Sequence, residues 1–209
     1  LGLRDRAKLL EARQAMLAGH WLRASTLLAA LPKAWVDSNP EARLWRAEVA
    51  ARRGRRPQAR AAFKALTAQA LDTIPREVQA AAHLGLSRLA FKGSREAALR
   101  EARGAAELLI AGTIFPRSLK VAARLQIARC HRANKRVGAA IAELQEALEL
   151  EPRSFDANLE LARVYLTLKK PLRALVFLAK ARKLRPDDKL ARRLLARACL
   201  RRTPLPPAC

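Results

Sequence analysis

Residues 121–188 repeat one pattern of small and bulky residues at an interval of 34 positions. In each copy, two apolar runs at helical spacing are separated by a short basic turn, which is the pattern of a helical hairpin. A single hairpin cannot bury its own apolar face, so a repeat of this length indicates hairpins stacked around a continuous core. The positions that recur in phase include Ala140 with Ala174 and Pro152 with Pro186.

Both copies resemble the tetratricopeptide repeat. The matching positions are a small residue on the first helix, an alanine and a leucine on the second, and a proline that starts the next unit: Ala128, Ala140, Leu144 and Pro152, then Ala162, Ala174, Leu178 and Pro186. The resemblance implies that Ala162 and Ala174 are buried where two antiparallel helices cross. The copies depart from the family at its bulky tryptophan position, which is Arg124 or Asn158, and His131 replaces its usual tyrosine in the first copy.

The first 110 residues contain looser versions of the same hairpin. The offsets between their corresponding alanines are 35, 39 and 42 residues, and we assign the surplus to the loops between hairpins, above all residues 111–117. Asn39 before Pro40 predicts a helix start, with asparagine as the cap and proline at the first helical position. The three expected helix pairs are 3–18 with 21–31, 40–53 with 56–71, and 75–91 with 95–110.

The predicted architecture is all-α, a right-handed α-solenoid of antiparallel hairpins with a C-terminal capping helix. Hydrophobic residues make up 51% of the chain but aromatic residues only 4%, and a core rich in alanine and leucine suits close-packed helices better than strands. We expect about eleven helices in one solenoid over residues 1–202, with degenerate hairpins over 1–110 and well-formed repeats with the cap over 118–202. Residues 203–209 are expected to form an extended tail.

The chain is strongly basic, with 42 Lys and Arg against 18 Asp and Glu and a formal net charge of +24. This excess favours an anionic partner: an acidic protein segment, a nucleic acid or a negatively charged lipid surface. The alternative is a composition bias in which most arginines are simply solvated. Membrane-surface contact is not favoured, because no predicted helix combines a bulky aromatic face with a basic one.

Three arginines follow the 34-residue interval: Arg129, Arg163 and Arg197 each come directly after the small residue of a first helix. The resemblance implies that this place faces a concave groove, so we expect a ladder of guanidiniums that binds an acidic or extended segment of a partner protein. Arg132 and Arg193 would widen the basic strip. The series is broken in the middle hairpins, near Glu48 and Ser87, and solvated arginines remain the alternative.

A second basic feature is the turn in which Arg52, Arg53, Arg55 and Arg56 surround Gly54. It fits a phosphate-binding knuckle and, equally, a solvated turn at a helix C-terminus, which the helix dipole favours. RNA binding is therefore the alternative function, supported by a pI of about 11.6. Against it, the chain has only nine aromatic residues with which to stack bases.

No catalytic constellation is evident. The histidines at 20, 83 and 131 are separated by whole hairpins, and the sequence has no glycine-rich phosphate loop and no metalloprotease or hydrolase motif. We therefore predict no enzyme, cofactor, metal site or small-molecule substrate. Cys130, Cys199 and Cys209 form no CxxC motif, and their odd number does not indicate a disulfide framework, which favours a reducing compartment such as the cytoplasm or an organelle matrix. The first two are expected to fill small spaces in the core.

Overall fold

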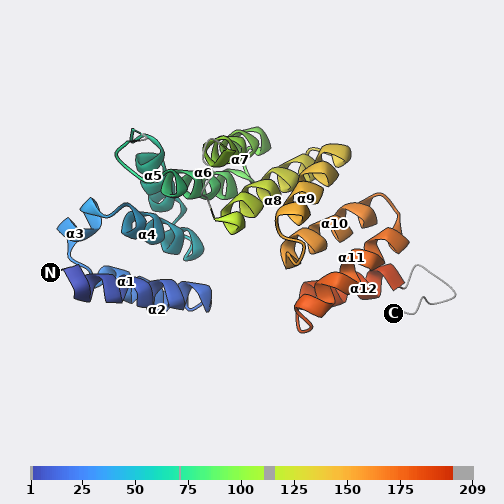
Figure 1. The fold of residues 1–209 in the computed structure, drawn as a ribbon, viewed down its shortest axis with the longest axis horizontal. Coiled ribbons are helices and arrows are strands. Elements are labelled where there is room, and N and C mark those ends of the chain that lie inside the picture. The colour runs from blue at the N-terminus through green and yellow to red at the C-terminus, as the bar shows by residue number, and fades with distance from the viewer. Residues whose placement is uncertain (1, 71, 111–115, 200–209) are drawn as a thin grey trace. The chain divides into compact units, whose positions relative to one another are not determined.

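The computed structural model describes residues 2–70, 72–110 and 116–199, and helices are the only regular secondary structure among these residues (Figure 1). The prediction of an all-α fold built from helical hairpins is confirmed. Twelve helices lie within the described residues: α1 (Gly2–Leu17), α2 (Trp21–Ala29), α3 (Lys33–Ser38), α4 (Pro40–Arg52), α5 (Arg56–Thr67), α6 (Arg76–Ala90), α7 (Arg95–Ile110), α8 (Arg117–Ala133), α9 (Val137–Leu150), α10 (Phe155–Thr167), α11 (Pro171–Leu184) and α12 (Lys189–Cys199).

The chain divides between Thr113 and Ile114 into two compact units. The first contains the hairpins α1/α2, α4/α5 and α6/α7, and the second contains α8/α9, α10/α11 and the single helix α12. Within each unit, helices contact only their hairpin partner or a neighbouring hairpin. The loop at 111–117, expected to be a boundary, lies mostly outside the described residues, as does the tail at 203–209.

The first unit contains a short helix that was not predicted from the sequence. Helix α3 has only six residues, too few to show a helical period, and it places Val36 in the core with 1% of its surface exposed. The predicted start of α4 is confirmed, because the Asn39 side chain accepts a hydrogen bond from the Ala42 amide at 3.0 Å and Pro40 opens the helix. The described residues therefore contain one helix, α3, more than the eleven predicted.

Helices α5 and α6 approach closely at Gly85. A Cβ atom at this position would lie 2.5 Å from Cζ of Phe63, whose side chain is fully buried. Glycine is required here because the aromatic ring occupies the space that any larger residue would need. The close crossing of α5 and α6 therefore depends on the large side chain of Phe63 and on the lack of a side chain at Gly85.

The second unit is built around the two in-phase repeats. Ala162 and Ala174 are both completely buried, which confirms that small residues lie at the crossing of α10 and α11. Helix α12 closes the same core with the buried residues Ala191, Leu195 and Ala198. It thus has the role that was predicted for a capping helix, over the described part of residues 187–202.

Four hairpin turns contain one residue with a left-handed backbone. In the first unit these residues are Gly19 and Gly54, with φ of 78° and 81°. In the second unit they are Lys135 and Lys169, with φ of 60° and 56°. A left-handed conformation is strained for any residue with a Cβ atom, so the two units form the same turn at different energetic cost.

The cysteines differ from the expectation in one respect. Cys130 is a buried thiol outside any disulfide, as expected for a core-filling residue. Cys199 is also buried and takes part in a disulfide bond, which was not predicted from the sequence. Among the described helices, none combines the length and the apolar character needed to cross a membrane.

Candidate protein-interaction site

Five charged residues from α8 and α10 meet in the second unit, and we call them the Glu160 cluster: Arg129, Arg132, Asp156, Glu160 and Arg163. Glu160 is almost fully buried, with 5% of its side chain exposed. Its Oε1 atom accepts from Nε of Arg129 at 3.0 Å and from Nη1 of Arg163 at 3.1 Å. Its Oε2 atom lies 3.4 Å from Nε of Arg132. Asp156 is more loosely held, 3.8 Å from Nη2 of Arg129.

The cluster has an excess of positive charge, with three guanidiniums against two carboxylates. Burial lowers the pKa of Arg132, and Glu160 opposes this shift while Arg163 and Arg129 add to it. Arginine stays charged because its ordinary pKa is so high. The three side chains keep between 23% and 36% of their surface exposed. Since each guanidinium has five N–H donors, the cluster can bind a further acceptor while Glu160 remains in place.

The structure brings together three of the five predicted groove arginines. Arg129, Arg132 and Arg163 converge on Glu160, whereas Arg193 and Arg197 are exposed on α12 and form no ion pair with any described residue. The expected ladder of open guanidiniums is thus replaced by a cluster with a shared carboxylate. Glu160 was not predicted from the sequence, although its position three residues before Arg163 places the two residues on the same helical face.

The two positions where the family has tryptophan carry polar residues with local partners. Arg124 on α8 reaches Glu143 at 2.9 Å and Glu146 at 2.6 Å, so an ion-pair network joins α8 to α9. Asn158 on α10 is buried and donates through Nδ2 to the Ser154 carbonyl at 2.7 Å. These departures from the family pattern are therefore accommodated by polar contacts within the second unit.

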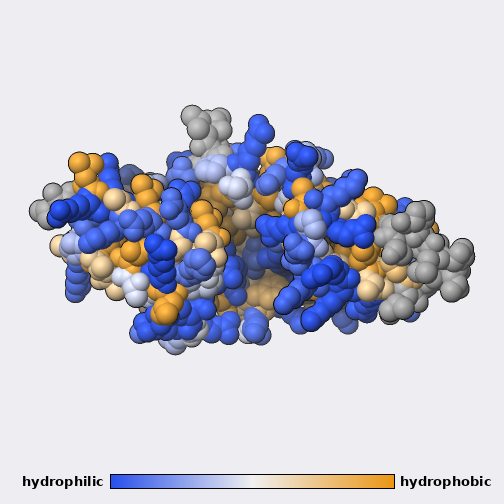
Figure 2. All heavy atoms as spheres, turned by 90° about the horizontal axis from the view of Figure 1, so that it is seen from below, coloured by the Kyte–Doolittle hydropathy of each residue, from blue (hydrophilic) through white to orange (hydrophobic). Residues whose placement is uncertain are grey.

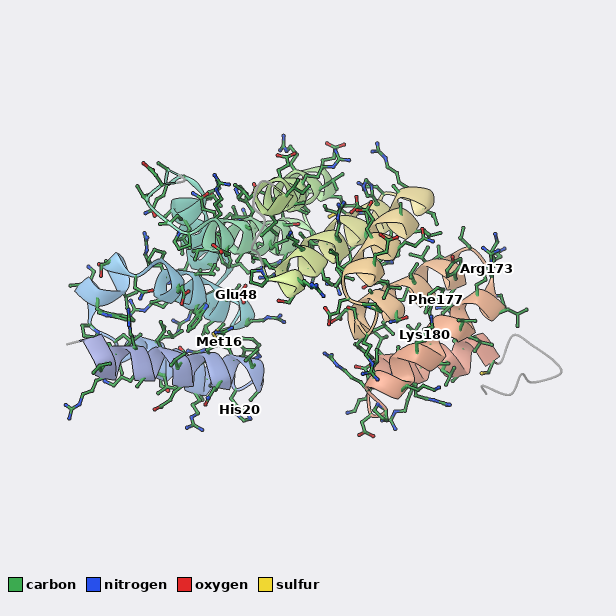
Figure 3. The ribbon with its side chains drawn as sticks, viewed as in Figure 1. Met16, His20, Glu48, Arg173, Phe177 and Lys180 are labelled. Atoms are coloured by element: carbon green, nitrogen blue, oxygen red, sulfur yellow. The ribbon has the colours of Figure 1, made fainter. Side chains whose placement is uncertain are left out.

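A pair of stacked aromatic rings lies between α10 and α11. The rings of Tyr165 and Phe177 are nearly parallel, with centroids 5.6 Å apart. Arg173 lies 5.9 Å from the Tyr165 ring and Lys180 lies 5.6 Å from the Phe177 ring (Figure 3). The contact of Arg173 with Tyr165 joins α11 to α10 and adds to the stacking attraction between them, whereas Lys180 and Phe177 both lie on α11.

The first unit has the opposite arrangement at the place where the arginine series breaks. Glu48 on α4 (Figure 3) forms an ion pair with Arg88 on α6, so the acid is on the earlier helix and the base on the later one. Both side chains are more exposed than Glu160, at 25% for Glu48 and 43% for Arg88. This pair is consequently a surface contact rather than a buried centre.

The four arginines around Gly54 do not converge. Arg52 lies over the Trp21 ring at 5.1 Å, Arg53 donates to Oγ of Ser25 at 2.7 Å, and Arg56 donates to the Leu89 carbonyl at 3.5 Å. Arg55 is exposed and, with Arg53, lines a hollow of about 430 Å³ between α2, α4 and α5. The four arginines therefore lie on several surfaces and do not form a single phosphate-binding knuckle.

Hydrophilic residues make up most of the surface visible in Figure 2, in both units, with smaller hydrophobic areas between them. Among the described residues, no group of His, Cys, Asp and Glu has the arrangement of a metal site. The described surface offers ionic and hydrogen-bonding chemistry, chiefly through guanidinium groups, beside exposed apolar side chains such as Leu22 and Val176.

Comparison with solved structures finds the same fold elsewhere. A thermophilic tetratricopeptide repeat protein from Thermus thermophilus is 26% identical, with 94% of this chain and 99% of that chain covered and a TM-score of 0.73. The type IV pilus biogenesis factor PilW is 19% identical, with 96% and 91% covered and a TM-score of 0.69. A chain of the APC/C hetero-tetramer Cut9-Hcn1 is 20% identical with a TM-score of 0.74; the match covers 93% of this chain but only 36% of that chain.

A search of curated proteins finds no match. Two family models, both described as tetratricopeptide repeat, match residues 9–73 and 131–198, which together are more than half of the chain. The first match falls in the degenerate hairpins, and the second runs from the end of α8 through α9, α10 and α11 into α12. The chain therefore belongs to the tetratricopeptide repeat family.

Proposed function

We propose that this protein is a non-catalytic scaffold whose second unit binds an acidic or extended segment of a partner protein. Tetratricopeptide repeat proteins generally act as protein-interaction scaffolds. The proposed contact residues are the arginines of the Glu160 cluster, extended by the exposed Arg193 and Arg197 on α12. The observation that carries the proposal is the convergence of three guanidiniums on one buried carboxylate.

Glu160 holds these arginines in place before a partner arrives. A free arginine side chain loses much of its rotamer freedom when it binds, and this loss weakens the complex. Arg129 and Arg163 already share Oε1 of Glu160, so less freedom remains to be lost. An incoming carboxylate would compete with the loosely held Asp156 for Arg129 and accept charge-assisted hydrogen bonds from the remaining donors.

RNA is the competing partner class, since the whole chain carries a formal charge of +24. No residue of the Glu160 cluster is aromatic, whereas single-stranded RNA binding commonly uses aromatic side chains to stack bases. The two carboxylates of the cluster repel any anion, so they disfavour the closely spaced phosphates of an RNA strand more than a peptide with few carboxylates placed beside the guanidiniums. These features favour a peptide that brings a few well-placed carboxylates over a uniformly charged backbone.

The proposal is tested with a fluorescein-labelled glutamate-rich peptide and the full chain. Replacing Arg129 and Arg163 with glutamine is expected to weaken the affinity of the second unit for the peptide about tenfold, because two charge-assisted contacts are lost. The matched control replaces Arg182 and Lys183, which are exposed on α11, and changes the net charge equally. An equal loss of affinity in both variants would mean that attraction is unspecific and the proposal wrong.

Glu160→Gln separates pre-organisation from total charge. This variant raises the net positive charge, so a purely electrostatic surface would bind the acidic peptide more tightly. We expect weaker binding instead, because the guanidiniums lose the carboxylate that orients them. The measurement is made where circular dichroism shows that the variant is folded. A labelled single-stranded RNA of equal charge serves as the second ligand, and tighter binding of RNA with a steep salt dependence would favour the competing class.

A further inference from the structure

The first unit contains a basic groove that shares no residue with the Glu160 cluster. It is a hollow of about 660 Å³ between α5 and the end of α6 with the turn that follows. We call it the α5 groove and define it by its lining residues: Arg56, Pro57, Arg60, Ala61 and Lys64 on α5, and Leu89, Lys92 and Gly93 on the opposite side.

The charge of the α5 groove is not compensated by its own walls. Four of its lining residues are cationic and none is acidic. Arg60, Lys64 and Lys92 are exposed and form no ion pair with a described residue. The fourth cation, Arg56, differs from these three because its Nη2 atom donates a hydrogen bond to the Leu89 carbonyl across the groove. The contrast with Arg129 and Arg163 is clear, because those side chains already share a carboxylate.

The spacing of the cations along α5 matches an extended peptide. Arg56, Arg60 and Lys64 are four residues apart, which on an α-helix is a rise of about 6 Å per step along one face. In an extended chain, side chains on one face recur every second residue, about 6.6 Å apart. Acidic side chains at alternate positions would therefore meet successive cations without bending the peptide. Lys92 faces the same space from the opposite side.

We propose that the α5 groove binds an extended acidic peptide whose carboxylates occupy alternate positions. Charge complementarity supports this occupant, and Pro57, Ala61 and Leu89 supply small apolar contacts for the peptide backbone. Nucleic acid is less well matched, because none of the groove's described lining residues is aromatic. The proposal goes beyond the function proposed above, since it assigns a second site on the other unit.

The experiment uses the full chain with Arg129 and Arg163 replaced by glutamine, so that the Glu160 cluster contributes little. The probe is a fluorescein-labelled peptide in which glutamate alternates with serine. Arg60, Lys64 and Lys92 are reversed to glutamate, while Arg56 is left in place because it contacts the Leu89 carbonyl. The expected result is an affinity loss of about tenfold or more, the sum of several exposed charge contacts.

The control variant reverses Arg23, Arg100 and Arg103, which are exposed in the same unit outside the groove, so its net charge is identical. We expect this control to bind the peptide within about twofold of the chain that carries only the Arg129 and Arg163 replacements, since none of the three reversed residues lies in the groove. Equal losses in the two variants would overturn the site. A peptide of the same composition with its glutamates in one block should bind less well, and equal binding would overturn the alternating register. Tighter binding of a labelled RNA, lost on reversing the groove, would overturn the peptide assignment.

Discussion

The two units join neighbouring first helices with charged side chains, but they do so in opposite ways. In the first unit, Glu48 and Arg88 form a single partly exposed pair between α4 and α6. In the second, Arg129 and Arg132 on α8 reach a buried Glu160 on α10. The same place in a hairpin stack therefore holds a surface ion pair in one unit and a buried ionic centre in the other. Burial of the carboxylate decides how much each arrangement affects stability.

The largest expected effect comes from removing the helix that closes the second unit. A chain that ends at Pro186 lacks α12 and leaves the apolar surfaces of α10 and α11 uncovered, so we expect aggregation. Size-exclusion chromatography with light scattering measures this directly. A chain ending at Arg202 is the control; because it lacks Cys209, both shortened chains are compared with the full protein under reducing conditions, where this control should behave as the full protein. A soluble monomer ending at Pro186 would show that α12 is not needed as a cap.

Removing the buried carboxylate tests the difference between the units. Glu160→Gln should cost about 2–3 kcal/mol, because three partly buried guanidiniums lose their counter-charge. Glu48→Gln should cost less than about 1 kcal/mol, since that pair is exposed. Urea unfolding followed by circular dichroism gives both values. Similar losses for the two variants would mean that burial of the ion pair does not distinguish the units.

The helix crossings allow a second comparison, between an alanine and a glycine. Ala162→Leu in the second unit should cost about 1–3 kcal/mol by overpacking the crossing of α10 and α11. Gly85→Ala in the first unit should cost a similar amount, although it adds only one methyl group, because Phe63 must move. Thermal unfolding measures both variants. An unchanged melting temperature for Gly85→Ala would mean that the ring shifts freely.

The smallest expected effects lie in the hairpin turns. Lys169→Gly should stabilise the second unit by up to about 1 kcal/mol, because glycine adopts the left-handed backbone without strain. Gly54→Lys should destabilise the first unit by a comparable amount for the same reason. Calorimetry of the two single variants is the measurement. Shifts of the same sign in both would refute the role assigned to backbone strain.

The sequence predicted the fold well where the evidence lies within one helix or one repeat. The burial of Ala162 and Ala174 follows from periodicity, and the cap at Asn39 follows from local chemistry. Helix α3 was missed because six residues show no period. A helix or cap can be predicted when its segment is long enough to show a period or contains a specific local motif, and helix α3 is too short for the first.

The binding surface was less predictable, because it depends on contacts between helices far apart in sequence. The 34-residue interval indicated that Arg129 and Arg163 share a face, but not that Glu160 lies between them. The interval also places Arg197 in the same series, and it lies exposed on α12 without an ion pair to a described residue. The pairing of Arg124 with α9 was likewise invisible, since it needs the relative position of two helices. Periodicity gives the direction of a side chain and leaves its partner undetermined.

Contacts confined to neighbouring hairpins also have a kinetic consequence. Because interacting residues are close in sequence, the contact order is low, and such chains collapse and order rapidly. Each unit has its own core, so ordering can nucleate in either one. The tryptophans Trp21, Trp35 and Trp45 all lie in the first unit, and the only tyrosine, Tyr165, lies in the second. Stopped-flow tryptophan emission therefore follows the first unit alone, and a slower phase seen only by circular dichroism would report the second.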